Sequence, residues 1–176
     1  MASIGHVAVG LAAGRLHAGE RPPAPAMVVF TILAMFPDLD VFAHEVLGVG
    51  WRSPWFHRGA LHSLPVAVLA GLLAAASGSL GRTRLRMALT AICVAASHGI
   101  LDAMTDGGQG IALFWPFTAR RYFAEWQFIP VAPIGIRFVS LRGVRVLAAE
   151  ALLFAPLLGY ALWPRRRAVA AAPPAA

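Results

Sequence analysis

A chain of 176 residues that is 59% hydrophobic and only 13% charged differs from soluble domains, which carry about a quarter charged residues. All fifteen positive side chains behind its net charge of +7 are arginines, several of them at the ends of apolar runs, and no basic stripe is interleaved with polar sequence. Membrane topology therefore explains the charge better than nucleic-acid binding does, and we expect one membrane domain over residues 1–164 and no nucleic-acid partner.

The first two apolar runs both lie close to polar residues. The sixteen residues 2–17 would reach about 24 Å as a helix, short of a hydrocarbon core of about 30 Å, so this helix should tilt little or enter only partway. No positively charged segment precedes it, so we expect no removable signal peptide. The second run, residues 24–36, leads into Asp38 and Asp40. We expect Pro37 to break this helix, so that both carboxylates point the same way from a non-helical turn.

Residues 55–63 place two imidazoles, a guanidinium and a hydroxyl directly before the third apolar run, residues 66–80. His57 and His62 are five residues apart, which is about 140° on an α-helix, so one helical face cannot present both to the same site. We therefore expect His57 in a loop and His62 near the start of the following helix. Gly59 should give that loop its freedom to turn.

The fourth run, residues 85–101, ends in a second polar group. His98 and Asp102 are four residues apart and project from one helical face, and Asp106 would continue this stripe if the helix persisted. Such a pair offers a metal an imidazole nitrogen and a carboxylate oxygen. Taken alone, the pair is more often an intrahelical hydrogen bond than a metal site.

The remaining chain contains an aromatic segment and a last apolar run. Residues 109–145 mix aromatic side chains with arginines and prolines, which suits an interfacial segment at the level of the lipid headgroups. Residues 146–163 form the last run, with a kink expected at Pro156. The basic and Ala/Pro-rich tail, residues 165–176, should be disordered. We therefore predict an all-α integral membrane bundle of about five helices with an interfacial aromatic segment.

Antiparallel runs would gather the candidate site residues at one end of this bundle. Eight arginines would lie at one end and seven at the other, and by the positive-inside rule we expect the site to face away from the cytoplasm. Carboxylates at membrane depth are costly enough to be functional by default. The residues expected at the site end are His6, Asp38, Asp40, His57, His62, His98, Asp102 and Asp106.

These ligands are more than one four-coordinate zinc requires, which suggests two divalent ions, zinc or manganese, that activate water against a phosphoester. Asp40 or Asp106 would act as general base, and Arg58 would bind the substrate anion. Plainer interpretations stay open: Asp38 can serve as a turn residue, Arg58 can pair with a nearby carboxylate, and Arg121, like its neighbour Arg120, can meet lipid phosphates. His17 and His44 we assign to ordinary structural roles.

Five features occur in order over nearly the whole chain: His6, Pro37-Asp38-Leu39-Asp40, His57-Arg58-Gly59-x-x-His62-Ser63, His98-x-x-x-Asp102, and Gly110 followed by Phe114-Trp115-Pro116-Phe117. Together they resemble the LexA-regulated, inner-membrane metal-dependent hydrolase family typified by YdjM. The His-Arg-Gly-x-x-His-Ser tract is the most specific feature. The resemblance implies a membrane protein with a metal-dependent hydrolase site, and it implies a ligand role for His6, Asp38, Asp40, His57, His62, His98 and Asp102.

The leading hypothesis is thus a metallohydrolase in the bacterial inner membrane, acting on a phosphoester or other ester of a lipid-linked or envelope substrate. A metal-ion or proton-coupled transporter is the main alternative, and it predicts ligands spread through the membrane depth. Haem ligation is a third, and it needs facing histidines near the middle of the membrane. The sequence indicates neither the substrate nor the oligomeric state.

Overall fold

Helices make up the regular structure of the chain, as predicted. The structure is a computed structural model that describes residues 3–78 and 83–164, and it contains no strand within those ranges. The expected disordered tail, residues 165–176, lies outside the described residues. The elements are α1 (Ser3–Ala18), α2 (Ala24–Met35), the 3-10 helix η1 (Phe36–Asp38), α3 (Leu39–Leu47), η2 (Ala60–His62), α4 (Leu64–Ala76), α5 (Arg84–Ala103), η4 (Gly135–Phe138), α6 (Leu141–Leu153) and α7 (Ala155–Leu162).

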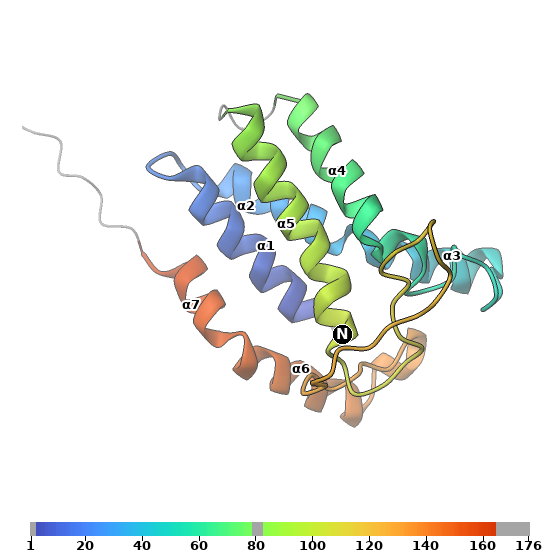
Figure 1. The fold of residues 1–176 in the computed structure, drawn as a ribbon. Helices are drawn as coiled ribbons and strands as arrows, with labels where there is room; N and C mark the ends of the chain where they lie inside the picture. The colour runs from blue at the N-terminus through green and yellow to red at the C-terminus, as the bar shows by residue number, and fades with distance from the viewer. Residues whose placement is uncertain (1–2, 79–82, 165–176) are drawn as a thin grey trace, which may run out of the picture.

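The bundle is built from close helix pairs. In Figure 1, α1, α5 and α4 lie side by side with α2 behind them, and α6 and α7 cross below α1. A Cβ atom added at Gly10 would lie 2.5 Å from the Cα of Thr31, and one added at Gly14 would lie 2.4 Å from the Cα of Met27. Only glycine therefore lets the backbones of α1 and α2 touch at these positions, as in small-residue contacts between membrane helices.

Two helices are long and apolar enough to cross a membrane, Ala24–Leu47 and Arg84–Ala103. The pair Leu141–Leu153 and Ala155–Leu162, bent by 65°, makes a third if it is one span. The predicted kink near Pro156 is therefore confirmed, although this helical region begins before residue 146. The α-helix α2 does end at Met35, directly before the expected break at Pro37, but the expected non-helical turn is wrong: η1 joins α2 to α3, so both Asp38 and Asp40 lie on helical turns. Pro37 is accommodated because it occupies the first turn of η1, where no N–H is needed.

Arginines gather at one end of the bundle, as the antiparallel arrangement predicts. Arg15 Nη1 on α1 donates to the carbonyls of Ala161 and Trp163, at the end of α7. Arg86 Nη2 near the start of α5 donates to Leu16 O. The ends of α1 and α7 and the start of α5 are thus linked, and the polar site residues lie at the opposite end.

The irregular segment after α5 packs over that opposite end. Isolated bridges pair Thr105 with Ile129 and Ile111 with Tyr122, and both isoleucines are completely buried. Aromatic side chains of this segment, including Phe117 and Trp126, are exposed, which is compatible with the predicted interfacial position. The segment also forms part of the protein interior, because its buried residues close the bundle.

Candidate metal centre

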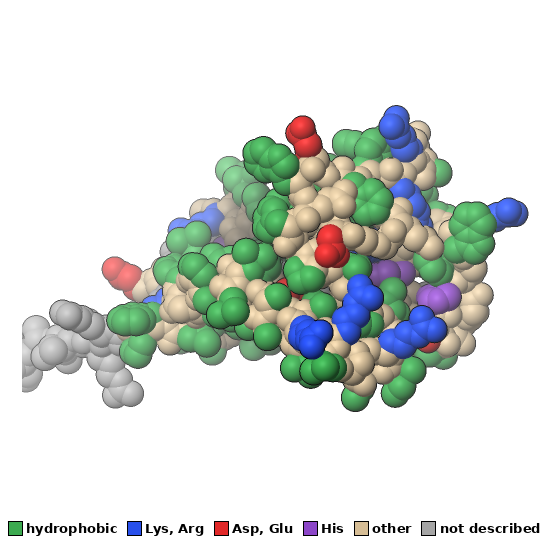
Figure 2. Space-filling view, turned by 90° about the horizontal axis from the view of Figure 1, so that it is seen from below, with side chains coloured by type: hydrophobic (Ala, Val, Ile, Leu, Met, Phe, Trp, Pro, Cys, Tyr) green, Lys and Arg blue, Asp and Glu red, His purple; other side chains and the backbone are tan. Residues whose placement is uncertain are grey.

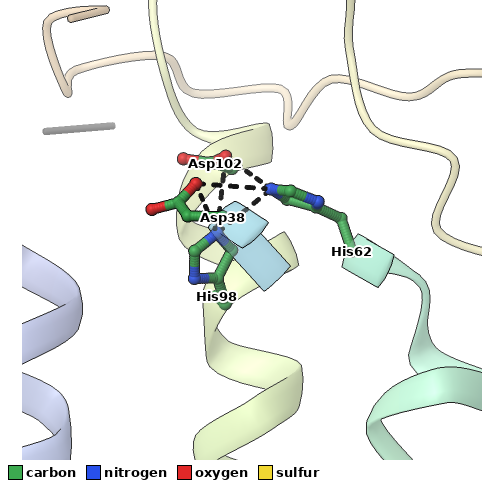
Figure 3. Close-up of side chains that lie close together, drawn as sticks. All are labelled: Asp38, His62, His98 and Asp102. Carbon is green, nitrogen blue, oxygen red and sulfur yellow. Dashed lines mark hydrogen bonds and ion pairs between the residues drawn. The ribbon is translucent and has the colours of Figure 1, made fainter. Parts of the chain in front are cut away.

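Four side chains from three elements meet where the helices end. Asp38 comes from η1, His62 from η2, and His98 and Asp102 from the last two turns of α5. Their ligand atoms all lie within 4.8 Å of one another, and Figure 3 shows them pointing toward a common centre. We call these residues the ligand cluster. It contains four of the seven residues predicted as ligands.

The spacing within the ligand cluster matches that of atoms around one metal ion. His98 Nε2 lies 3.1 Å from His62 Nε2 and 3.4 Å from Asp38 Oδ1, and His62 Nε2 lies 3.4 Å from Asp102 Oδ2. His62 Nε2 lies 3.9 Å from Asp38 Oδ1, and His98 Nε2 lies 3.9 Å from Asp102 Oδ2. Bonds of about 2.0–2.1 Å at tetrahedral angles place ligand atoms roughly 3.3 Å apart. The cluster can therefore hold a divalent ion with little rearrangement of its side chains.

The backbone fixes the orientation of His98. Its Nδ1 lies 2.7 Å from the carbonyl oxygen of Ala34 on α2, so this nitrogen carries the proton and Nε2 presents its lone pair to the cluster. A metal-binding histidine almost always donates its second nitrogen in this way. Gly99 serves a different contact: it lets η2 approach α5 closely, since a Cβ there would lie 2.2 Å from His62 O.

Asp40 lies outside the ligand cluster and contacts His62, one of its members. Its Oδ2 lies 3.0 Å from His62 Nδ1 and accepts the backbone N–H of Arg58, while its Oδ1 lies 2.7 Å from His57 Nδ1. Burial opposes the charged form of His62, but the carboxylates of Asp102 and Asp40 outweigh it and raise the pKa of the ring to about 9. Asp40, His57 and His62 form a second group that could hold an ion. Its two shortest contacts have hydrogen-bond lengths, which favours a network that orients His62.

Arg58 takes the unusual backbone conformation in the loop before η2. Its φ of 66° lies in the left-handed region, held by its N–H on Asp40 and by its carbonyl, which accepts from Ala112 N–H. The freedom predicted for Gly59 is therefore used at the preceding residue. Gly59 is needed for space instead, because a Cβ there would lie 2.1 Å from Pro54 O. His57 lies in this loop and His62 directly before α4, as predicted.

The guanidinium of Arg58 pairs with the ligand cluster. Its Nε lies 3.5 Å from Asp102 Oδ2, and its Nη1 donates to Gly107 O. Arg121 Nη1 donates to the carbonyls of His57, Arg58 and Gly110. These hydrogen bonds stabilise the loop before η2. The lipid-phosphate interpretation of Arg121 is not needed to explain its position.

His6 lies beside the ligand cluster and not inside it. Its ring stacks on His98 with 3.6 Å between ring centroids, and its Nε2 lies 3.6 Å from Asp102 Oδ1. Neither ring nitrogen of this fully buried side chain has a hydrogen-bond partner among the described residues. Such a polar group is unusual in a protein interior and indicates a site built for a further atom or ion.

The other predicted residues have different surroundings. Asp106 lies beyond the end of α5 and is exposed, so the stripe from His98 does not continue to it, and its Oδ1 accepts the N–H of Val131. His17 lies near Thr90 and His44 near Val49 O, in agreement with structural roles. Sequence reasoning missed Glu150, which is completely buried on α6 and accepts the N–H of Gly5. A lone carboxylate in an apolar run was the available signal.

A cavity of about 590 Å³ opens beside the ligand cluster. Asp38, His57 and Arg58 contribute to its wall, and the side chain of Asp38 is 23% exposed, whereas the other three members of the cluster are buried. Figure 2 looks onto this end of the bundle, where hydrophobic side chains surround arginines and visible histidine. Access to the cluster is therefore from the Asp38 side.

Comparison with known proteins agrees with this architecture. A profile of the YdjM inner membrane protein family matches residues 1–169. The chain belongs to this family. It is 36% identical over 172 residues to inner membrane protein YbcI of Escherichia coli strain K12, covering 93% of this chain and 98% of that protein. No solved structure matches it significantly.

Membership in the YdjM family places the chain in the inner membrane. The two candidate spans Ala24–Leu47 and Arg84–Ala103 then carry three of the four cluster residues, Asp38, His98 and Asp102. Polar side chains on membrane-crossing helices carry a large desolvation cost. Here the contacts that these residues make with one another, at one end of the bundle, offset that cost.

Proposed function

We propose that this protein is a membrane-embedded metal-dependent hydrolase that cleaves a phosphoester or other ester. The observation that carries the proposal is the ligand cluster: two imidazole nitrogens and two carboxylate oxygens at metal-ligand spacing, open to a cavity only at Asp38. Asp38, His62, His98 and Asp102 would hold a divalent ion such as zinc or manganese, which would lower the pKa of a bound water and polarise the ester.

His57 and Asp40 are suited to move the proton that this reaction releases. With Nδ1 of His57 directed at Asp40 Oδ1, the neutral ring has its lone pair on Nε2, and His57 lines the cavity. A carboxylate that holds an imidazole in one tautomer is a common general-base arrangement. We propose that His57 Nε2 takes the proton from the attacking water and that Asp40 positions it. Asp106, which contacts Val131, is the alternative base that variants can test.

Arg58 is suited to bind the anionic part of the substrate. It lines the cavity, and its guanidinium is held in place because Nε lies near Asp102 and Nη1 donates to Gly107. A guanidinium fixed in this way at a cavity wall can stabilise the charge that develops on a phosphoryl oxygen.

The cluster geometry favours a hydrolase over the two rivals. A transporter would spread ligands along the membrane depth, whereas these lie at one end of the helices. The two Nε2 atoms of His62 and His98 are 3.1 Å apart, which is too close for axial ligands on opposite sides of a haem iron.

Metal analysis of purified variants tests the proposal. His98→Ala and Asp102→Ala should lose the metal that the wild-type chain retains, because each removes one ligand and leaves the others unsupported. His57→Ala should keep the metal and lose at least about a hundredfold in hydrolysis of a phosphoester panel, the usual contribution of a general base. His44→Ala, a histidine outside the ligand cluster, is the matched control and should change neither.

Two results would contradict the proposal. Unchanged metal content in both His98→Ala and Asp102→Ala would remove the metal site. Metal flux into proteoliposomes by a wild-type protein that hydrolyses no member of the panel would favour transport instead.

A further inference from the structure

The cavity beside the ligand cluster is much larger than an ion and its water require. Its volume of about 590 Å³ falls in the range of sites that enclose whole organic ligands. It lies between α3 and the segment of residues 131–138. The apolar side chains on its walls include Val41, Phe56, Val131, Ala132, Ile134 and Phe138.

Polar groups in this cavity are confined to a few positions. Asp38, His57 and Arg58, which belong to or touch the ligand cluster, lie on its wall with Ser3 and Gln109. The cavity therefore has a polar part at the cluster and an apolar remainder. This distribution is complementary to an amphiphile whose reacting group is charged and whose other end is hydrocarbon.

Both walls continue into exposed apolar surface. On α3, Leu39 and Phe42 are each 60% exposed, and α3 belongs to the candidate span Ala24–Leu47. On the other side, Ile136 and Val139 are more than 80% exposed. Large exposed hydrophobic side chains on both sides of an opening are typical of a surface that contacts lipid. A hydrocarbon chain can thus pass between bilayer and cavity without crossing water.

We infer that this cavity binds the hydrocarbon chain of an amphipathic phosphate ester, whose phosphate lies at the polar part of the cavity, beside Arg58 and Asp38. This inference rests on the proposed function and adds the substrate class. Hydrolysis of such an ester breaks the bond between phosphorus and the bridging oxygen, water supplies the new oxygen on phosphorus, and the alcohol leaves with a proton. The apolar walls hold the chain and the guanidinium holds the phosphate.

Photo-crosslinking locates the chain without depending on turnover. The probe is dodecylphosphonate with a diazirine at the middle of the chain, applied to the full-length, zinc-loaded protein in phosphatidylcholine nanodiscs, because its P–C bond is not cleaved by the proposed reaction. Crosslinks should map to Val41 and residues 131–138. Unlabelled dodecylphosphonate should suppress them, whereas inorganic phosphate and dodecanol, which supply the headgroup or the chain alone, should compete about tenfold less well or worse, since two buried methylenes are already worth about that factor.

A matched pair of tryptophan variants tests the cavity itself. Ala132→Trp fills its wall and should reduce crosslinking about tenfold. Ile136→Trp places the same side chain on the exposed surface of the same segment and should leave crosslinking unchanged. Val41→Phe narrows the cavity from α3 and serves as the test if Ala132→Trp loses its metal. Wild-type crosslinking in these filling variants, or crosslinks confined to the lipid-facing sides of α4 and α5, would overturn the inference.

Hydrolysis of p-nitrophenyl phosphate, which lacks the chain, separates the two proposals. If the wild type hydrolyses this ester but filling the cavity does not alter crosslinking, the chain-binding site is wrong and the hydrolase stands. If cavity-dependent crosslinking is present but neither this ester nor dodecyl phosphate is hydrolysed, the binding site stands and the hydrolase is wrong.

Discussion

Carboxylates flank both ring nitrogens of His62. Asp40 lies 3.0 Å from Nδ1 and Asp102 lies 3.4 Å from Nε2. These neighbours raise the pKa of the buried ring to about 9, so near neutral pH the metal-free protein holds a proton there. A metal ligand must be deprotonated, and the incoming ion therefore has to displace this proton.

Metal affinity should accordingly depend on pH. Between about pH 6 and about pH 8, below the raised pKa, the association constant for zinc should rise about tenfold per pH unit as one proton is released. Competition with a calibrated chelator measures this slope. Asp40→Asn removes one of the charges that raise the pKa and should flatten the upper part of the curve. A wild-type affinity independent of pH would contradict this assignment of the proton.

For single residues, the sequence predicts which side chains could bind a metal better than it predicts which groups orient those side chains. His98 and Asp102 could be paired by their spacing, and Asp38 was conspicuous because carboxylates are rare in apolar helices. The carbonyl of Ala34, which orients His98, has no signal in a sequence, since every residue offers a carbonyl. The support of His62 by Asp40 likewise depends on a fold that brings distant segments together.

Among the helices, the contact of α1 with α2 has a direct consequence for the site. Gly14 lies against the backbone of Met27, and His6, two turns earlier on α1, stacks on His98 of α5. Any change that separates α1 from α2 also shifts His6 from the ligand cluster. Helix packing and site geometry are therefore coupled through α1.

Gly14→Ala should destabilise the protein by about 1–3 kcal/mol, because its Cβ overlaps backbone that cannot move aside. Thermal unfolding in detergent measures the change. Gly159→Ala on α7 is the matched control, since nothing lies within 4 Å of its added Cβ, and there the better helix propensity of alanine should keep or raise stability. Equal midpoints for the two variants would show that the glycine contact does not matter.

Helix boundaries can be predicted from the sequence where a capping residue stands at the start of an apolar run. Thr83 and Ser63 cap α5 and α4 through side-chain contacts with Arg86 N–H and Val66 N–H, and both runs were predicted within a few residues. The non-helical turn expected after Pro37 is wrong because a proline in the first turn of a helix needs no partner for its missing N–H. Here η1 begins at Phe36 and leads directly into α3.

The molecule as a whole separates two kinds of arginine. At the end opposite the ligand cluster, Arg15 and Arg86 donate hydrogen bonds to backbone carbonyls at the ends of α7 and α1. At the cluster end, Arg58 and Arg121 hold a carboxylate and a set of loop carbonyls, so their positions are explained by the site. Two arginines at each end thus have structural partners, so the excess of arginine predicted for the end opposite the ligand cluster is unchanged and still favours that end for the cytoplasm.

This asymmetry predicts that the ligand cluster faces away from the cytoplasm. In a Cys93→Ser background, a membrane-impermeant maleimide added to cells with a permeabilised outer membrane should label Glu125→Cys, which lies in the segment that packs over the cluster end. Arg84→Cys at the other end should react only after the inner membrane is disrupted. Both positions are exposed, so a difference in labelling reports the side of the membrane and not burial. The reverse pattern would place the site on the cytoplasmic side. The arginines at the cluster end would then be the ones that keep their loops in the cytoplasm.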